Sequence, residues 1–149
     1  MDQNIILLLK QLNLSLEQYG RNQMKNLDIS PSQSLVLEYL FFRNGDIVYA
    51  TELHEKFGIS KSAISSTLKG LKKKGYVETA TNPEDDRMKQ IFLTPKAFAM
   101  KERIESGLQE EQRHLCREIP SQHLEIMKKG LNTMIHNLRQ ESARRKEQW

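Results

Sequence analysis

Apolar side chains recur along most of this chain at intervals of three and four residues, the spacing that puts them on one face of a helix. The pattern predicts helices over residues 4 to about 26, 31 to about 44, 50–57, 61 to about 74, 95 to about 119, and from 121 onwards. Residues 76–80 and 90–93 instead have the character of strands, joined by a turn-forming segment at 82–87. Ile47 and Val48 could add a short strand. The pattern therefore predicts a mainly helical fold with one small β-hairpin.

Local signals mark where several of these helices begin and end. Ser30, Pro31 and Gln33 have the sequence of a capping box with proline in the first turn. Gly58 ends one helix and Ser60 caps the next, so only a few residues separate the two, as in a helix-turn-helix. With the hairpin that follows, the order predicts a winged helix-turn-helix over residues 30–94. Helical parts flank it at 1–28 and 95–146 of the single 149-residue chain.

The helix predicted from residue 61 has two different faces. Ile64, Leu68 and Leu71 are spaced four and three apart and should face the core. The other face is small and polar near its start and cationic near its end, and consists of Lys61, Ser62, Ser65, Ser66, Lys69 and Lys72. Small side chains let a helix enter the major groove of DNA, and hydroxyl and ammonium groups bind base edges and phosphates. An ordinary solvated helix face is the alternative.

The tip of the predicted hairpin carries charges of both signs. Arg87 and Lys89 could reach the minor groove or phosphates, and Asp85 could pair with Arg87 and fix its direction. An ordinary surface turn is the alternative, and Asp86 and Glu84 favour it, since acidic groups near DNA are unfavourable. The net charge of the chain is +4, which permits a nucleic-acid partner without requiring one. The placement is more informative, because residues 61–74 contain five lysines and no acid.

Several segments together resemble the MarR family of bacterial transcription regulators. The resemblance runs from Ser30 to Ala97, and the flanking helices match in pattern only. The matching segments are Ser30-Pro31-Ser32-Gln33, Glu52-Leu53, Phe57 to Ser65, Leu71 to Val77, Asp85-Asp86-Arg87 and Leu93 to Lys96. Asp85, Arg87, Leu93 and Thr94 fill the family's wing signature. The chain departs from the family at Asp86, where relatives often have a basic residue, and at Ala97, where a glycine is common.

The resemblance implies a homodimer that binds a pseudo-palindromic operator, most often as a repressor. It implies that the helix from Lys61 reads the major groove, and that Arg87 reads the minor groove. The residues expected at the dimer interface are the apolar positions Leu8, Leu12, Leu124, Met127, Leu131, Met134 and Leu138. The last five are spaced three and four apart, as in a coiled-coil seam. Relatives often release DNA when a small aromatic or phenolic ligand binds, so such an effector is a possible partner.

The sequence contains few signals of catalysis, metal binding or cysteine chemistry. There is no glycine-rich phosphate loop, nucleophile elbow or metal-binding pair, so neither an enzyme nor a cofactor is expected. The single cysteine, Cys116, excludes an internal disulfide and is expected to be a bystander rather than a redox switch. No membrane span or targeting segment is visible, which predicts a cytoplasmic protein that associates with the nucleoid. The alternative function is a winged helix that binds protein, without sequence-specific DNA binding.

Overall fold

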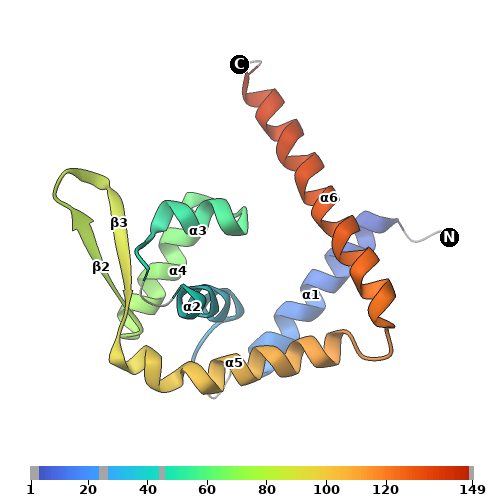
Figure 1. Ribbon diagram of the computed structural model, residues 1–149, viewed down its shortest axis with the longest axis horizontal. Coiled ribbons are helices and arrows are strands. Elements are labelled where there is room, and N and C mark those ends of the chain that lie inside the picture. Colours follow the sequence, from blue (N-terminus) through green and yellow to red (C-terminus); the bar gives the residue numbers. More distant parts are fainter. Residues whose placement is uncertain (1–3, 24–26, 44–45, 148–149) are drawn as a thin grey trace. The chain divides into compact units, whose positions relative to one another are not determined.

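The structure is a computed structural model that describes residues 4–23, 27–43 and 46–147, without the side chains of Asp86, Arg87 and Glu147. Its elements are α1 (Ile5–Gln23), α2 (Pro31–Phe42), β1 (Val48–Tyr49), α3 (Ala50–Phe57), α4 (Lys61–Lys73), β2 (Val77–Asn82), β3 (Asp85–Leu93), α5 (Pro95–Leu115) and α6 (Ser121–Glu147) (Figure 1). They form two compact units, Met1–Glu111 and Gln112–Trp149.

The predicted fold class is confirmed, because helices predominate and the sheet is small. The three strands are antiparallel in the order β1-β3-β2, so β3 lies in the middle. Val48 pairs with Ile91 at one edge, and Val77 pairs with Leu93 at the other. The hairpin β2–β3 is the wing, and Figure 1 shows it beside α4.

The wing is longer than the sequence predicted. The segment 82–87 has the composition of a turn, but β2 extends to Asn82 and β3 begins at Asp85, which leaves only Pro83 and Glu84 between the strands. Asn82 pairs with Asp85, and the Asn82 Oδ1 accepts the backbone N–H of Glu84 at 3.0 Å. An irregularity between Thr81 and Asn82 adjusts the register at this end. The charged tip is therefore mostly strand, because backbone pairing continues through residues whose side chains favour loops.

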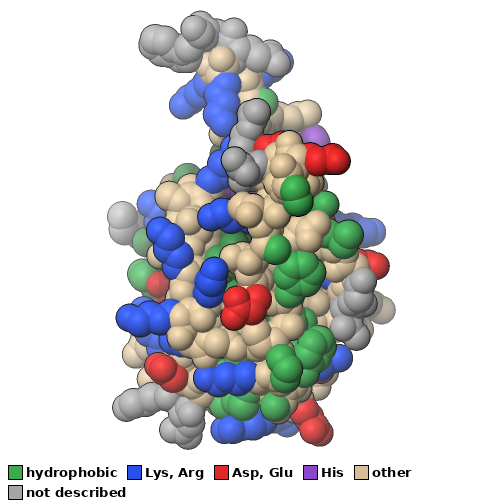
Figure 2. Space-filling view, turned by 90° about the vertical axis from the view of Figure 1, so that its left-hand side faces the viewer, with side chains coloured by type: hydrophobic (Ala, Val, Ile, Leu, Met, Phe, Trp, Pro, Cys, Tyr) green, Lys and Arg blue, Asp and Glu red, His purple; other side chains and the backbone are tan. Residues whose placement is uncertain are grey.

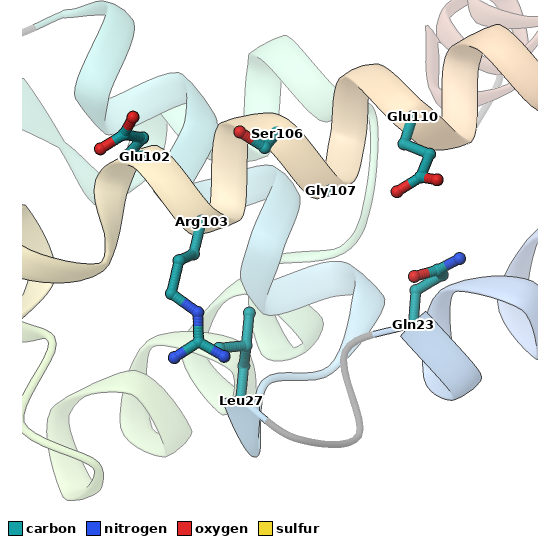
Figure 3. A pocket seen from close by; sticks show the side chains of 7 residues that line it. All are labelled: Gln23, Leu27, Glu102, Arg103, Ser106, Gly107 and Glu110. Carbon is teal, nitrogen blue, oxygen red and sulfur yellow. The ribbon is translucent and has the colours of Figure 1, made fainter.

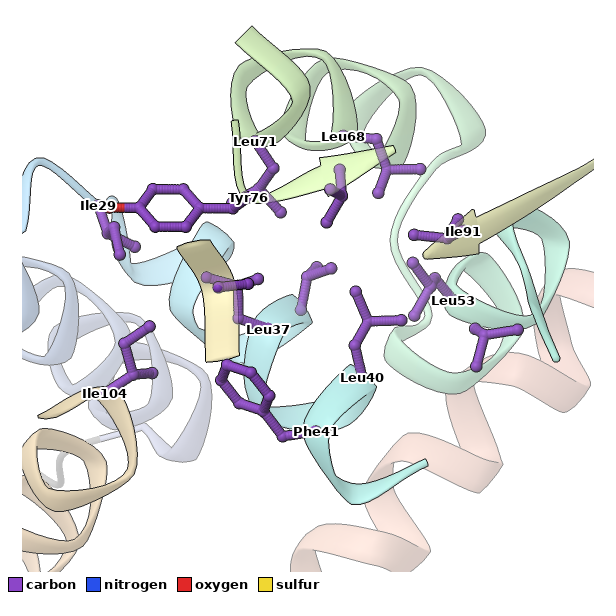
Figure 4. Packing of buried hydrophobic residues seen from close by; sticks show 14 of the residues in the cluster. Ile29, Leu37, Leu40, Phe41, Leu53, Leu68, Leu71, Tyr76, Ile91 and Ile104 are labelled. Carbon is purple, nitrogen blue, oxygen red and sulfur yellow. The ribbon is translucent and has the colours of Figure 1, made fainter. Parts of the chain in front are cut away.

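One hydrophobic core lies within the first unit, between α2, α3, α4, the sheet and the start of α5 (Figure 4). Leu37, Leu53 and Leu71 are fully buried, one from each of the three helices α2, α3 and α4. Ile104 brings α5 into the same cluster. Burial of such a side chain contributes about 1.5–3 kcal/mol. The positions of α2, α3 and α4 are therefore set by shared apolar packing.

Candidate nucleic-acid interface

The turn before α4 fixes the start of that helix. Gly58 ends α3 with φ 66°, a left-handed conformation that glycine adopts without strain. The Ser60 Oγ accepts the backbone N–H of Ala63 at 3.2 Å, so Ser60 caps α4 as the sequence predicted. The His54 Nδ1 contacts the Ile59 carbonyl oxygen across this turn. These contacts fix the position of the first turn of α4 and of the backbone N–H groups at this N-terminal end of the helix.

The two faces of α4 agree with the sequence prediction. Ile64, Leu68 and Leu71 are buried. All five residues predicted to contact DNA from this helix are exposed, and they are Lys61, Ser62, Ser65, Ser66 and Lys69. Lys73, one turn beyond Lys69, is exposed as well, although it was not among the predicted contacts. The exposed face of α4 therefore begins with one cation, continues with small polar side chains and has further cations near its end.

The remaining two lysines of the run are bonded to the protein. The Lys72 Nζ donates to the Thr79 Oγ1 at 3.2 Å, which joins α4 to the wing strand β2. The Lys74 Nζ donates to the Gln33 Oε1 at 2.9 Å and to the Asp28 carbonyl oxygen. It also lies 3.9 Å from the Asp28 carboxylate. Lys74 therefore attaches the end of α4 to the segment before α2.

Gln33 is a polar residue in the contact between the end of α4 and α2, and 9% of its surface is exposed. Its Oε1 also accepts the backbone N–H of Ser30 at 3.1 Å, while the Ser30 Oγ accepts the N–H of Gln33 at 3.2 Å, which confirms the predicted capping box. Gly70 of α4 faces the same amide, and a Cβ there would lie 2.5 Å from the Gln33 Nε2. The lack of a side chain at Gly70 lets α4 pack closely against α2.

The start of α5 holds the end of α4 from another direction. The Lys96 Nζ donates to the Lys74 carbonyl oxygen at 2.6 Å and lies 4.7 Å from the centroid of the Tyr76 ring. The Thr94 Oγ1 donates to the Gly75 carbonyl oxygen at 2.6 Å. A cation on the last carbonyls of a helix is favourable because those carbonyls carry partial negative charge. The orientation of α4 is thus fixed at both of its ends.

A charged cluster joins α2 to α3. The Tyr39 hydroxyl donates to the Glu52 carboxylate, and the Arg43 guanidinium donates to the same carboxylate and, at 3.0 Å, to the Tyr39 oxygen. Burial and the bond to Glu52 raise the pKa of Tyr39 above its ordinary value, so the phenol stays protonated. The Tyr39 ring also packs edge-on against Phe57, with centroids 5.8 Å apart. These two helices are therefore joined by polar and aromatic contacts.

The wing contributes a further cation. Lys89 is exposed on β3, opposite Thr81, on the same face of the hairpin as Thr79 and Ile91. Thr79 binds Lys72, so this is the face that meets α4. Arg87 lies in β3, but its side chain is outside the described ones, and its predicted role stays a prediction. Asp85 is half-buried and lies opposite Asn82.

Figure 2 shows the side of the molecule on which the wing lies. Lys and Arg side chains gather on one part of this face, and hydrophobic ones gather on another. Within the described part of the chain, none of Lys61, Lys69 and Lys73 pairs with a carboxylate. The cations of α4 are therefore available to an anionic partner.

A family model for the MarR family matches residues 27–88. These are the residues from the segment before α2 into the wing, and they include most of the interface described above, while Lys89, Thr94 and Lys96 lie beyond them. The winged-helix part of this chain is therefore similar to the MarR family. The resemblance found in the sequence is thereby confirmed.

A curated relative of this chain is YdgJ of Bacillus subtilis (strain 168), described as an uncharacterized HTH-type transcriptional regulator. It is 33% identical over 87 residues, which are 58% of this chain and 50% of that protein. The match therefore spans about half the length of the relative.

Solved structures with the same fold include two that are bound to DNA. The MepR–DNA complex of S. aureus has a TM-score of 0.83 and 20% identity, over 91% of this chain and 99% of that one. A mutant MarR from E. coli, complexed with operator DNA, has a TM-score of 0.73 and 23% identity, over 85% of this chain and 90% of that one. At this level of identity the likeness establishes the winged-helix fold of this chain.

The predicted dimerisation residues are nearly all exposed within the chain. Leu8 and Leu12 lie on α1, where 39% and 40% of their surfaces are exposed. On α6, Leu124 is half-buried, and Met127, Leu131, Met134 and Leu138 are exposed. No residue of α6 up to Lys146 is buried. The helix continues through residues 144–146.

A pocket of about 340 Å³ lies beside α5, within the first unit (Figure 3). Its lining residues come from the end of α1, the segment before α2 and the middle of α5, and they are Gln23, Leu27, Glu102, Arg103, Ser106, Gly107 and Glu110. In Figure 3 the Arg103 side chain extends toward Leu27, while Gln23 and Glu110 face each other. The lining is mixed in charge, with one guanidinium and two carboxyl groups.

The described residues offer few further candidate sites for metal binding or cysteine chemistry. Among the described residues, no group of three His, Cys, Asp or Glu side chains is placed to hold a metal ion. The described helices include none with the length and apolar character that a membrane crossing requires. Cys116 is half-buried just after α5.

Sequence reasoning missed the contribution of four residues to this candidate interface. They are Gln33, Lys73, Lys74 and Lys96. A local signal existed for Gln33, as the acceptor of the capping box, but its contact with Lys74 joins residues 41 positions apart. No sequence signal separates Lys74, which binds the protein, from Lys73, which is exposed.

Proposed function

We propose that this protein is a sequence-specific DNA-binding transcription regulator, and that it binds double-stranded DNA as a homodimeric repressor. The observation that carries the proposal is the exposed face of α4, which has small residues and Lys61 in its first half and cations near its end. The helix is also supported at both ends. In a helix-turn-helix, the second helix enters the major groove and its first residues meet the base edges. This role needs no catalysis, and we place it in the bacterial cytoplasm at the nucleoid.

The exposed lysines predict how the affinity for DNA should depend on the salt concentration. Lys61, Lys69, Lys73 and Lys89 give each protomer four exposed ammonium groups beside the proposed groove. If each meets a phosphate, log K should fall with log salt at a slope of roughly −3.6 for one protomer and about twice that for a dimer. Arg87 is proposed to add a minor-groove contact, with Asp85 as its support.

The homodimer is supported by the apolar residues that the single chain leaves exposed. Leu131 and Met134 lie about one helical turn apart on α6, and 39% and 38% of their surfaces are exposed. A helix of 27 residues without a described buried side chain gains little from packing in its own chain, so a second copy would supply the missing contacts. A two-fold dimer would place its two α4 helices on the two halves of a pseudo-palindromic operator.

We further propose that a small aromatic acid regulates DNA binding from the pocket beside α5. Arg103 supports a carboxylate ligand, since a guanidinium binds carboxylates through paired hydrogen bonds. Salicylate and 4-hydroxybenzoate are suitable probes. Either should weaken DNA binding by the wild type and have no effect on Arg103→Ala. Release of DNA from Arg103→Ala at the same concentrations would contradict this site.

A selection from random double-stranded DNA tests the main proposal. The expected result is one enriched sequence with two related halves, bound much more tightly than unrelated DNA at physiological salt. The alternative, a winged helix that binds protein, predicts no enriched sequence and only weak binding that disappears as salt rises. Sedimentation of the protein alone, and of its complex with the selected DNA, tests the dimer.

A further inference from the structure

The exposed face of α4 lacks the side chains that identify an adenine through two hydrogen bonds. All residues of α4 are described, and its exposed positions carry only lysine, serine and alanine. The commonest bidentate contacts in the major groove are from arginine or lysine to guanine and from asparagine or glutamine to adenine. This helix can therefore offer lysine to guanine, but it has no asparagine or glutamine for adenine. Recognition of an A·T pair by this helix must come from smaller groups or from the shape of the DNA.

The hydroxyl groups of α4 discriminate weakly. The Ser60 Oγ caps the helix and lies 3.1 Å from the Ser62 Oγ, and the Thr67 Oγ1 donates to the Ala63 carbonyl oxygen at 3.0 Å. These hydroxyl groups already have hydrogen-bonding partners within the protein. Ser65 and Ser66 remain as exposed hydroxyls, but a hydroxyl both donates and accepts, so it pairs with several bases.

The exposed face of α4 carries one apolar side chain among these polar ones, that of Ala63. Ala63 is exposed in the first turn of α4, the part of a recognition helix that meets base edges. Its backbone N–H is bound to Ser60, which fixes where its methyl group points. The one apolar feature in the major groove is the methyl group of thymine, and alanine is among the side chains that contact it. An exposed alanine in that position gains nothing in water and gains a contact at an A·T pair.

We propose that Ala63 is a specificity-determining residue that recognises a thymine methyl group in the major groove of the operator. This proposal rests on the function proposed above. Its neighbours Ser62 and Ser66 are small enough to let the backbone of α4 approach that base closely. The operator should therefore have an A·T pair at the position that faces the first turn of α4 in each half.

The test replaces single thymines of the selected DNA by deoxyuridine, which removes only the methyl group. At one position in a half-site, the wild type should lose about fourfold in affinity, the effect of one buried methyl-sized group. With Ala63→Gly, thymine and deoxyuridine at that position should bind equally well. Ala63→Ser is a second variant that helix starts tolerate well, and it should lower the ratio of the two affinities toward one.

A matched control separates this contact from a loss of helix stability. Ala99 is exposed on α5, away from the proposed interface, so Ala99→Gly has the same propensity cost. The Ala99→Gly protein should keep the fourfold preference for thymine. A preference lost in both variants would show that stability, rather than the Ala63 methyl group, was responsible, and would overturn the proposal.

The remaining outcomes are distinct. If no sequence is enriched, the proposed function fails and this inference fails with it. If a sequence is enriched but no single deoxyuridine changes the affinity, the regulator stands and the Ala63 inference is wrong. If deoxyuridine weakens Ala63→Gly as much as the wild type, the methyl group acts through DNA shape, which also overturns the role of Ala63.

Discussion

Gly70 lies inside α4, where alanine is ordinarily the better helix former, yet we expect Gly70→Ala to destabilise the protein. The new methyl group would lie 2.5 Å from the Gln33 Nε2, well inside contact distance. A free glutamine could turn away at little cost. Gln33 is not free, because its Oε1 accepts hydrogen bonds from the Ser30 backbone at 3.1 Å and from the Lys74 ammonium at 2.9 Å.

The magnitude follows from these opposed effects. Alanine in place of glycine should stabilise the helix by about 1 kcal/mol. Moving the Gln33 amide should cost about 1 kcal/mol for the neutral hydrogen bond and about 1.5–3 kcal/mol for the charged one. The net expectation is a destabilisation of about 1.5–3 kcal/mol. The clash therefore outweighs the helix propensity.

The assay is urea denaturation followed by circular dichroism, at one fixed protein concentration, because association would shift the apparent stability. Gln33→Ala supplies the decisive background. Once the amide is absent, the methyl group introduced by Gly70→Ala has room, and the substitution should stabilise that protein by about 0.5–1 kcal/mol. The sign of the same substitution should thus reverse between the two backgrounds.

A neutral or stabilising effect of Gly70→Ala in the wild type would refute this reasoning. So would an effect of the same sign and size in both backgrounds, since the two sites would then be independent. Either result would mean that the Gln33 amide moves without loss of its two bonds, and that the close approach of α4 to α2 is not fixed there.

Four further substitutions test other parts of the structure. Lys69→Ala should weaken DNA binding and reduce the salt slope by about one per protomer, whereas Lys74→Met should lower stability and leave the slope unchanged. An unchanged slope for Lys69→Ala would exclude its phosphate contact. Leu131→Asp should dissociate the proposed dimer, and a variant that sediments like the wild type would show that the seam is elsewhere. Burial and the Glu105 carboxylate raise the pKa of Glu38, so the folded state binds this proton more tightly than the unfolded state does. Stability should then fall as pH rises above about 4.5, and Glu38→Gln should stabilise the protein at pH 7 but not at pH 4.

The parts of the fold that could be predicted are those with local causes. Ser30, Ser60 and Thr94 each accept a hydrogen bond from a backbone N–H three residues later, and each has the sequence context of a helix start. The buried stripe of α4 followed from periodicity alone. The length of the wing could not be predicted in this way, because pairing between Asn82 and Asp85 depends on the partner strand.

The exposed residues of the candidate interface were predicted correctly as exposed, while their supports were not found. The contact between Lys74 and Gln33, and that between Lys96 and the Lys74 carbonyl oxygen, join elements that are distant in the sequence. Periodicity shows which way a side chain faces, but not which neighbour it meets. The DNA contacts themselves, including those of Arg87, stay predictions.

The run of five lysines from 61 to 74 therefore overstates the charge that α4 offers to DNA. Lys74 is bonded to Gln33 and to the Asp28 carbonyl oxygen, and Lys72 is bonded to Thr79. A phosphate would have to displace those partners, and Lys74 could not leave without loosening the attachment of α4 to α2. Three lysines of the helix remain exposed and without such bonds, and each can contribute about 0.9 to the salt slope. Counting lysines in the sequence would predict a contribution of about 4.5 per protomer from this helix, whereas the structure predicts about 2.7. The salt slopes of the wild type and Lys74→Met help to distinguish the two, because a phosphate contact by Lys74 would lower the slope of the variant and its bond to Gln33 would leave the slope unchanged.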